Sequence, residues 1–231
     1  MNEASELSYL KKKIAEVLSF DIDLNDDLFR LASIVNLAQG QVLFTQGELA
    51  QNCFLILSGS LRISLKMNSS ESTVAILSKG EFGGVLLMSN SSSYFPGSVI
   101  ALTQSCVLLI PKETYVTAWT RNPKALNIIN NCVHKRMQYL QEDKALQQLD
   151  VESRLIAFLH RHFLEKKDLI SKKITRKDIS LAIGAKTETV IKKKKKLERD
   201  GLVKTEKSVI SILDRSYFTR AMNYENRKWS R

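Results

Sequence analysis

Residues 174–203, ITRKDISLAIGAKTETVIKKKKKLERDGLV, decide how the C-terminal part of the chain folds. Thr175 has the side chain of a good N-cap, and Asp178, three positions later, completes a capping box. We expect the first helix to end at Gly184, because glycine readily takes the left-handed conformation that closes a helix. A second helix follows directly. Two helices joined by so short a turn form a helix-turn-helix, whose second helix fits the major groove of DNA.

The second helix starts at Lys186 or Thr187 and exposes side chains whose chemistry suits DNA. Glutamate accepts a hydrogen bond from the cytosine amine, lysine donates to guanine, and threonine contacts phosphate or the thymine methyl. Basic and hydroxyl-bearing residues around the two helices and the following two-stranded wing should contact phosphates, which gives affinity without sequence information. The expected phosphate contacts are Thr175, Arg176, Lys177, Lys186, Thr189, Lys204 and Lys207.

Positive charge is concentrated in this same part of the chain. The 231 residues carry a net charge of +11, but residues 1–149 are balanced, with 13 basic and 13 acidic side chains. Residues 150–231 hold 22 basic and 11 acidic side chains, which accounts for the whole excess. This segregation predicts a polyanionic partner for the C-terminal part. Solubility alone would explain a net charge but not its position.

The segment from Gly40 to about Ile110 consists of short apolar and β-branched runs, separated by Gly and Ser at intervals of about ten residues. This pattern predicts an all-β barrel or roll. A parallel α/β sheet is not expected, because no helices separate the runs. The preceding residues should be helical, with Ile14 and Leu18 on one face and a second short helix over residues 28–35.

A long helix is expected over residues 119–149, between the β region and the basic end. Apolar residues recur along it at near-heptad spacing before Lys144 interrupts them, which favours a coiled-coil dimer helix. The alternative is a helix that packs only on its own β domain. The expected dimer stripe consists of Leu126, Ile129, Val133, Met137 and Leu140.

Several classes of protein are not expected. No stretch approaches the roughly 20 apolar residues of a membrane span, and the N-terminus lacks the apolar core of a signal peptide. Three scattered cysteines do not make a disulfide framework, so we expect a soluble cytoplasmic protein with no membrane partner. The sequence lacks the usual nucleophile–base pairs, metal-ligand spacings and phosphate loops, so we expect no enzyme.

Two patterns, in order along the chain, resemble those of one family. The first is Gly40-x-x-Leu43-Phe44-x-x-Gly47, followed by Phe54-x-Ile56-Leu57-x-Gly59-x-Leu61-Arg62. The second is Thr175-Arg176, Ile179, Gly184, Glu188-Thr189-Val190, Leu197-Glu198 and Gly201-Leu202. Over nearly its whole length the chain thus resembles the cyclic-AMP receptor/fumarate-nitrate regulator (Crp/Fnr) superfamily of bacterial transcription factors.

The resemblance implies an α+β fold and a homodimer that binds a palindromic double-stranded DNA site and works with RNA polymerase. The family's base-reading positions fall on Thr187, Glu188 and Lys192. Glutamate matches the family's residue type, whereas arginine is common at the other two positions. The implied parts are an N-terminal helical segment (1–36), a β-roll sensor domain of the cyclic-nucleotide-binding type (37–118), a dimerisation helix (119–149) and a winged helix-turn-helix (150–231).

The sensor pocket departs from the family pattern. Cyclic-nucleotide binders of this family hold the phosphate with a glycine-rich turn, a glutamate and an arginine–serine pair, since a buried anion needs a cation and several donors. Here no Arg or Lys lies between Lys79 and Lys112. We therefore expect no gating by cyclic AMP, and the alternative is a cyclic-nucleotide-gated regulator with an altered pocket. The degenerate pocket positions are Gly83, Gly84, Val85, Leu86, Phe95 and Pro96.

No cofactor signature is present. The cysteines are too dispersed for an iron–sulfur cluster, and the histidines fall on expected helices, so we expect neither haem nor another metal site. An unidentified effector, a protein partner and no ligand at all stay open as alternatives. A different class of function is a module that binds nucleic acid without sequence preference or that binds another protein.

The run Lys192 to Lys196 is a second departure from the family, which usually has apolar residues at Lys193 and Lys194. Five consecutive lysines place charge all round a helix. We expect their stems to lie along the edge of the core and their ammonium groups to reach DNA or solvent.

Overall fold

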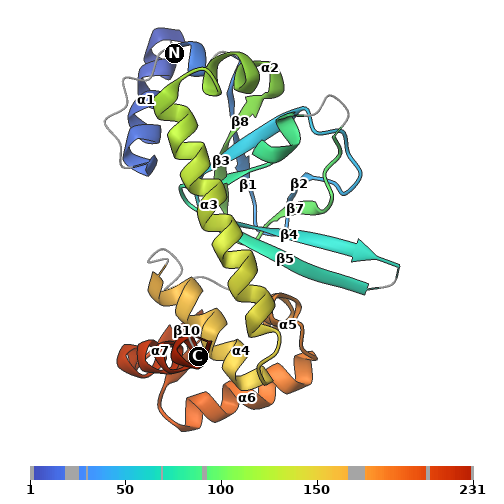
Figure 1. The fold of residues 1–231 in the computed structure, drawn as a ribbon, viewed down its shortest axis with the longest axis vertical. Coiled ribbons are helices and arrows are strands. Elements are labelled where there is room, and N and C mark those ends of the chain that lie inside the picture. The colour runs from blue at the N-terminus through green and yellow to red at the C-terminus, as the bar shows by residue number, and fades with distance from the viewer. Residues whose placement is uncertain are drawn as a thin grey trace. The chain divides into compact units, whose positions relative to one another are not determined.

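The computed structural model describes residues 3–18, 26–29, 31–68, 70–89, 93–165, 175–206 and 209–229. The chain divides into two compact units (Figure 1). The N-terminal unit comprises Met1–Ser69 and Val74–Met137, and the C-terminal unit comprises Ser70–Thr73 and Gln138–Arg231. Lys207 lies outside the described residues, so its expected phosphate contact has no structural counterpart here.

The β region forms two four-stranded sheets, in the orders β1-β8-β3-β6 and β2-β7-β4-β5. The pairs β1–β8, β3–β8, β3–β6, β2–β7 and β4–β7 are all antiparallel. This confirms the roll predicted from the short runs. The strands are β1 (Ser33–Leu37), β2 (Val42–Phe44), β3 (Asn52–Ser58), β4 (Ser60–Met67), β5 (Ser70–Ser78), β6 (Phe82–Gly83), β7 (Ser98–Ala101) and β8 (Ser105–Pro111).

The helices around the roll include the 3-10 helices η1 (Asp26–Phe29) and η2 (Val85–Ser89) and the π-helix η3 (Tyr115–Trp119). The α-helices are α1 (Glu3–Leu18), α2 (Lys112–Thr114) and α3 (Pro123–Leu146). The helix predicted over residues 28–35 is wrong, because the helical turn ends at Phe29 and the chain then forms β1. All five residues of β1 pair with β8, so hydrogen bonds to a strand distant in sequence override the local helical pattern.

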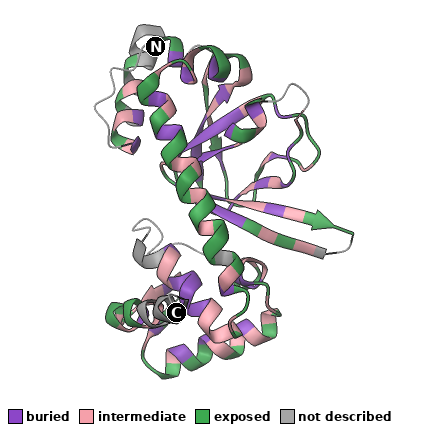
Figure 2. Cartoon of the chain, in the orientation of Figure 1, coloured by how far each residue is buried: buried purple, intermediate pink, exposed green. Residues whose placement is uncertain are grey.

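The core of the N-terminal unit lies between the sheets and under the helices (Figure 2). The central strand β3 is buried on both faces, since Cys53 to Ile56 have no exposed surface. Trp119 closes one end of this core. Its indole Nε1 donates to the Leu28 carbonyl at 2.7 Å, and its ring meets Phe82 edge-on.

The first half of α3 packs on this core. Ala125, Ile128 and Ile129 are buried by the N-terminal unit, so placing Ile129 in the dimer stripe is wrong. The physical reason is the helical repeat. Ile129 follows Ala125 by four positions and therefore faces the β-roll with it.

The other members of the predicted stripe keep exposed surface. Leu126 and Val133 are half-buried, and Met137 and Leu140 are 51% and 45% exposed. These four residues follow one another by seven, four and three positions, which is the spacing of a coiled-coil seam. Val133 also packs partly against the core of the N-terminal unit, whereas Met137 and Leu140 remain exposed.

The C-terminal unit is helical with a small sheet. It contains α4 (Val151–Leu159), the π-helix η4 (His160–Glu165), α5 (Arg176–Ile183), α6 (Thr187–Arg199), β9 (Val203–Glu206), β10 (Val209–Ile212) and α7 (Arg215–Trp229). β9 and β10 form the two-stranded wing. The predicted helix-turn-helix with a wing is therefore confirmed. The side chains expected to join its helices, Ile179, Ile183, Val190 and Leu197, are all buried.

The two surfaces of α3 make different predictions for stability. We expect Ile129→Ala to lower the free energy of unfolding by about 2–5 kcal/mol at every protein concentration, because it leaves a cavity in the core. Met137→Ala should matter only at concentrations where two protomers associate. Urea denaturation over a range of protein concentrations measures both, and equal effects of the two variants at high dilution would contradict this assignment.

Candidate nucleic-acid interface and sensor interior

The first helix of the helix-turn-helix begins and ends as the sequence predicts. The amide of Asp178 donates to Thr175 Oγ1 at 3.1 Å, and the amide of Thr175 donates to Asp178 Oδ2 at 3.2 Å. At the other end Gly184 has φ 60° and ψ 45°, which is the left-handed conformation. Both ends of α5 are thus fixed by local chemistry, so the position of the turn is fixed too.

Helix α4 supports the turn from outside the motif. The Arg154 guanidinium donates to the carbonyl of Ile183 at 2.8 Å and to that of Gly184 at 3.3 Å. These carbonyls lie at the end of α5, where they lack partners within the helix. Arg154 therefore attaches α4 to the turn that sets the direction of α6. The sequence did not single out this residue, because its partners lie about 30 positions away.

The exposed face of α6 is strongly charged. Glu188, Lys192, Lys195 and Arg199 are all exposed and follow one another by four, three and four positions, so they form a single stripe. Glu188 and Lys192 are two of the predicted base readers. Lys195 and Arg199 extend the stripe by two turns. Lys195 and Arg199 were not predicted as part of the interface, although the same helical spacing indicates them.

Thr187 differs from the other two predicted base readers. It is half-buried, and its hydroxyl donates to Ser180 Oγ at 3.2 Å. Ser180 is itself buried on α5. In this structure the Thr187 hydroxyl thus bridges the two helices of the motif rather than pointing away from them. Lys186, which precedes it as the N-cap, is exposed.

The lysine run splits between the surface and the domain's own partners. Lys192 and Lys195 are exposed, whereas Lys193 and Lys196 both donate to the carboxylate of Glu152 on α4, at 3.0 and 2.7 Å. Lys194 is only 6% exposed. Its ammonium donates to Thr205 Oγ1 on β9 at 2.9 Å and lies 3.4 Å from Glu198. The expectation that all five ammonium groups reach DNA or solvent is wrong for Lys194, whereas Lys193 is half-buried and Lys196 stays exposed in their pairing with Glu152.

The pKa of Glu152 is held below its ordinary value. The hydrogen bond from Lys196 is the main cause, the bond from Lys193 adds to it, and partial burial opposes both. A carboxyl whose folded pKa is depressed stabilises the fold above its unfolded pKa of about 4.3. The contribution of Glu152 is therefore present at neutral pH and is lost as the pH falls through the folded pKa.

The remaining predicted phosphate contacts lie at the surface. Thr175, Arg176 and Lys177 are exposed at the start of α5, and Thr189 is half-buried in the first turn of α6. On the wing, Lys204 Nζ lies 2.6 Å from Glu206, and this bond raises the pKa of Lys204. Both side chains of the pair are exposed, so phosphate can replace Glu206 as the partner of Lys204.

Phe95, which the resemblance places where the family's phosphate-binding arginine–serine pair begins, is buried among aromatic side chains of the β-roll. Phe95 is 3% exposed, and its ring stacks on Phe44 with centroids 4.3 Å apart. Phe44 lies in turn 6.1 Å from Phe54. A Cβ atom at Gly83 would approach the Phe54 ring to 2.1 Å, so this glycine is needed for Phe54 to fit.

The other degenerate pocket positions also carry apolar residues, with different degrees of burial. Val85, where the family has glutamate, is buried, while Gly84 is half-buried with φ +77°. Leu86 and Pro96 are exposed. The two positions that would carry the ribose and phosphate ligands, Val85 and Phe95, are thus buried and apolar, and neither can donate to or neutralise an anion.

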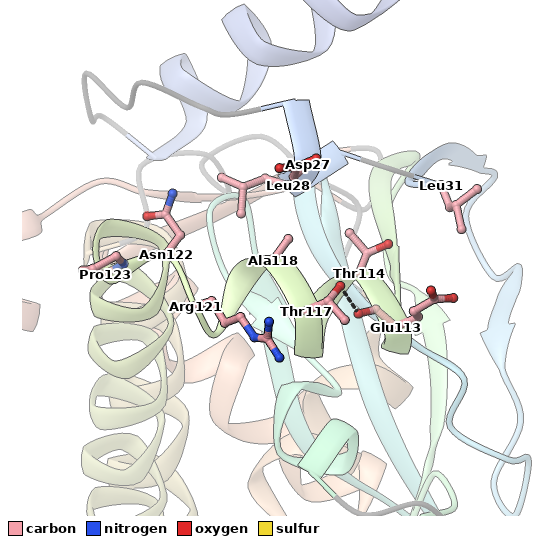
Figure 3. Close-up of a pocket in the computed structure, with 10 residues that line it drawn as sticks. All are labelled: Asp27, Leu28, Leu31, Glu113, Thr114, Thr117, Ala118, Arg121, Asn122 and Pro123. Carbon is pink, nitrogen blue, oxygen red and sulfur yellow. Dashed lines mark hydrogen bonds between the residues drawn. The ribbon is translucent and has the colours of Figure 1, made fainter.

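A separate cavity of about 490 Å³ lies beside η1, α2 and η3 (Figure 3). Its charged walls are Asp27, Glu113 and Arg121, which sum to a negative charge. The Thr117 hydroxyl on its wall already donates to the Glu113 carbonyl at 2.7 Å. This cavity therefore does not replace the positive clamp that the roll lacks.

No cluster of His, Cys, Asp and Glu suited to a metal ion occurs among the residues that the structure describes. The same residues include no helix that is long and apolar enough to cross a membrane. Cys53 and Cys106 are buried in the core and form no disulfide bond. Burial raises the pKa of the Cys53 thiol to about 12, so it stays protonated.

Lys194 generates a prediction about stability. Replacement of a buried ion pair by apolar side chains often leaves a fold equally stable or stabilises it by about 1–4 kcal/mol, whereas removal of one member is costly when the other stays buried. The side chain of Glu198 is 30% exposed, so water can solvate its carboxylate when Lys194 is replaced. We therefore expect Lys194→Met to match or exceed the parent in urea denaturation, and Lys194→Ala to lose the packing of the stem. Lys195→Met is the exposed control, with an effect within about 0.5 kcal/mol. A large loss of stability in Lys194→Met would show that the ammonium contacts outweigh burial of the stem.

Two separate family models of known proteins match the β-roll and the helix-turn-helix parts of the chain. Residues 34–122 match the family model of the cyclic nucleotide-binding domain, and residues 153–221 match that of the Crp-like helix-turn-helix domain. The chain is also 27% identical to the global nitrogen regulator of Synechococcus elongatus, over 76% of this chain and 83% of that protein.

Solved structures share the fold. The c-di-GMP-responsive global regulator CLP of Xanthomonas campestris has a TM-score of 0.69 at 20% identity, over 82% of this chain and 97% of its own. FixK2 of Bradyrhizobium japonicum has a TM-score of 0.70 at 16% identity, over 83% of this chain and 97% of its own. With a cyclic-nucleotide-binding-type roll followed by a Crp-like winged helix-turn-helix, the chain belongs to the Crp/Fnr superfamily of transcription regulators.

Proposed function

We propose that the protein is a sequence-specific DNA-binding transcription regulator that acts as a homodimer on a palindromic site. The observation that carries this proposal is the exposed stripe of Glu188, Lys192, Lys195 and Arg199 on the second helix of the motif. Glutamate and lysine side chains form the hydrogen bonds that distinguish bases in the major groove. The net positive charge of the C-terminal part supplies the attraction to phosphates.

The proposed dimer uses the exposed seam of α3. Leu126, Val133, Met137 and Leu140 would meet the same residues of a second protomer, which buries apolar surface that one protomer leaves exposed. A two-fold axis along this seam makes the DNA site palindromic, with half-sites one helical turn, or about 34 Å, apart. As a regulator, the dimer would work with RNA polymerase, and we assign it no catalytic activity and no cofactor.

We further propose that cyclic AMP does not gate this regulator. Support comes from the buried apolar pair at Val85 and Phe95, since desolvating a phosphate without a cation costs several kcal/mol. A cyclic-nucleotide-gated regulator with an altered pocket would have to displace the stacked ring of Phe95 from Phe44. The similar regulator from Xanthomonas campestris is described as responsive to c-di-GMP, so cyclic AMP is not the only effector used with this fold.

Base reading by Glu188 predicts a defined loss of selectivity. We expect footprinting on selected genomic fragments to reveal a palindrome, and Glu188→Ala to relax the preference at one base pair of each half-site by about 1–3 kcal/mol. Lys204→Ala is the matched control, because loss of a phosphate contact weakens binding to all DNA alike. Equal affinity of the parent for random and selected DNA at matched salt would instead support a non-specific module.

The filled roll predicts no cyclic-nucleotide binding. Calorimetric titration of the dimer with cyclic AMP, and separately with cyclic GMP, should give no saturable heat at micromolar ligand. Saturable binding in that range would contradict the proposal. It would favour the altered-pocket alternative.

A further inference from the structure

We propose that Glu152 limits the sequence-independent affinity for DNA by withholding Lys193 and Lys196 from phosphates. This inference rests on the proposed function, because it concerns how strongly the same surface binds DNA. One carboxylate binds both lysines, with Lys193 Nζ at 3.0 Å from Oε2 and Lys196 Nζ at 2.7 Å from Oε1. The two oxygens of Glu152 are thus each occupied by a different ammonium group.

The lysines lie where DNA would compete for them. Lys196 follows Lys192 by four positions, so the two side chains are neighbours on the helix surface. Lys192 belongs to the exposed stripe proposed to enter the groove. The side chains of Lys193 and Lys196 keep 37% and 47% of their surface exposed, whereas that of Glu152 keeps only 18%. The ammonium groups could therefore turn to a phosphate, but the carboxylate is confined.

The carboxylate is confined because α4 is fixed on both sides of it. Asp150 caps α4, and its Oδ1 accepts from the amides of Glu152 and Ser153 at 2.7 and 3.2 Å. Arg154 binds the turn of the helix-turn-helix. Glu152 lies between these two anchors in the first turn of α4. It therefore holds the lysines toward α4 rather than following them toward DNA.

The consequence concerns the affinity for DNA of any sequence. A lysine that neutralises a phosphate raises affinity for every sequence alike, and each such contact adds about 0.9 to the salt dependence of log K. Two additional phosphate contacts would therefore strengthen binding to random and selected DNA alike and leave the ratio of the two affinities nearly unchanged. By pairing with both lysines, Glu152 reduces this sequence-independent affinity while leaving the stripe of Glu188, Lys192 and Lys195 free to act.

Glu152→Gln tests the inference, with binding to a selected palindrome and to a random duplex measured from low to moderate salt. We expect the slope of log K against log salt to steepen by about 1–2 on both duplexes, while the ratio of specific to non-specific affinity at each salt concentration stays nearly unchanged. Glu142→Gln is the matched control. It also removes one carboxylate from the C-terminal unit, but its partner is Arg161, at 2.8 Å. The triple variant Glu152→Gln/Lys193→Met/Lys196→Met should return to the parent slope.

A second comparison does not depend on the Glu152 variant being stable. In the parent background, Lys193→Met/Lys196→Met should leave the non-specific slope nearly unchanged, whereas Lys192→Met/Lys195→Met should reduce it by about 2. The inference is overturned if the two double variants lose the same slope, or if Glu152→Gln behaves as Glu142→Gln does. A parent that binds no DNA selectively would contradict the proposed function instead.

Discussion

The C-terminal unit depends on how α6 distributes its charge. Val190, Lys194 and Leu197 are buried on one side of this helix, and Glu188, Lys192 and Lys195 are exposed on the other. A helix with so many lysines would repel itself if all of them faced one region. Glu152 and Thr205 reduce this repulsion, because Glu152 pairs with the ammonium groups of Lys193 and Lys196 and Thr205 accepts a hydrogen bond from the buried Lys194. The exposed stripe of Glu188, Lys192 and Lys195 is of mixed sign.

In the N-terminal unit, the free-energy cost of burying an anion limits which ligands the β-roll can hold. A roll that holds a cyclic phosphate must carry a cation in its interior. In this chain the corresponding space is taken by the stacked rings of Phe44 and Phe95 and by Phe54 against Gly83. The roll keeps the architecture of a nucleotide-binding domain while its interior resembles an ordinary apolar core. If cyclic AMP does not gate this regulator, as we propose, any signal that the roll transmits uses other chemistry.

Local chemistry explains what could be predicted from the sequence. The capping box of Thr175 and Asp178 and the left-handed Gly184 involve residues within a few positions of one another, so their pattern is sufficient to place α5 and the turn. The substitutions at Val85 and Phe95 could likewise be interpreted against the family pattern.

Strand β1 could not be predicted, because its pairing with β8 joins residues about 70 positions apart. The partners of long side chains are equally hard to predict. Lys193 and Lys196 bind a carboxylate on α4, and helical periodicity within α6 contains no information about that contact. The prediction that Ile129 belongs to the dimer stripe of α3 was wrong, because heptad spacing alone does not distinguish a residue at a dimer seam from one that faces the core.

These features support α6 as the proposed DNA-binding surface. Competitive lysine acetylation, quantified by mass spectrometry with and without a selected duplex, measures this contact residue by residue. We expect the duplex to protect Lys192 and Lys195 strongly while leaving the exposed Lys66 and Lys124 of the N-terminal unit as reactive as before. Unchanged reactivity of Lys192 and Lys195 in the complex would show that the helix does not enter the groove and would contradict this view of the protein.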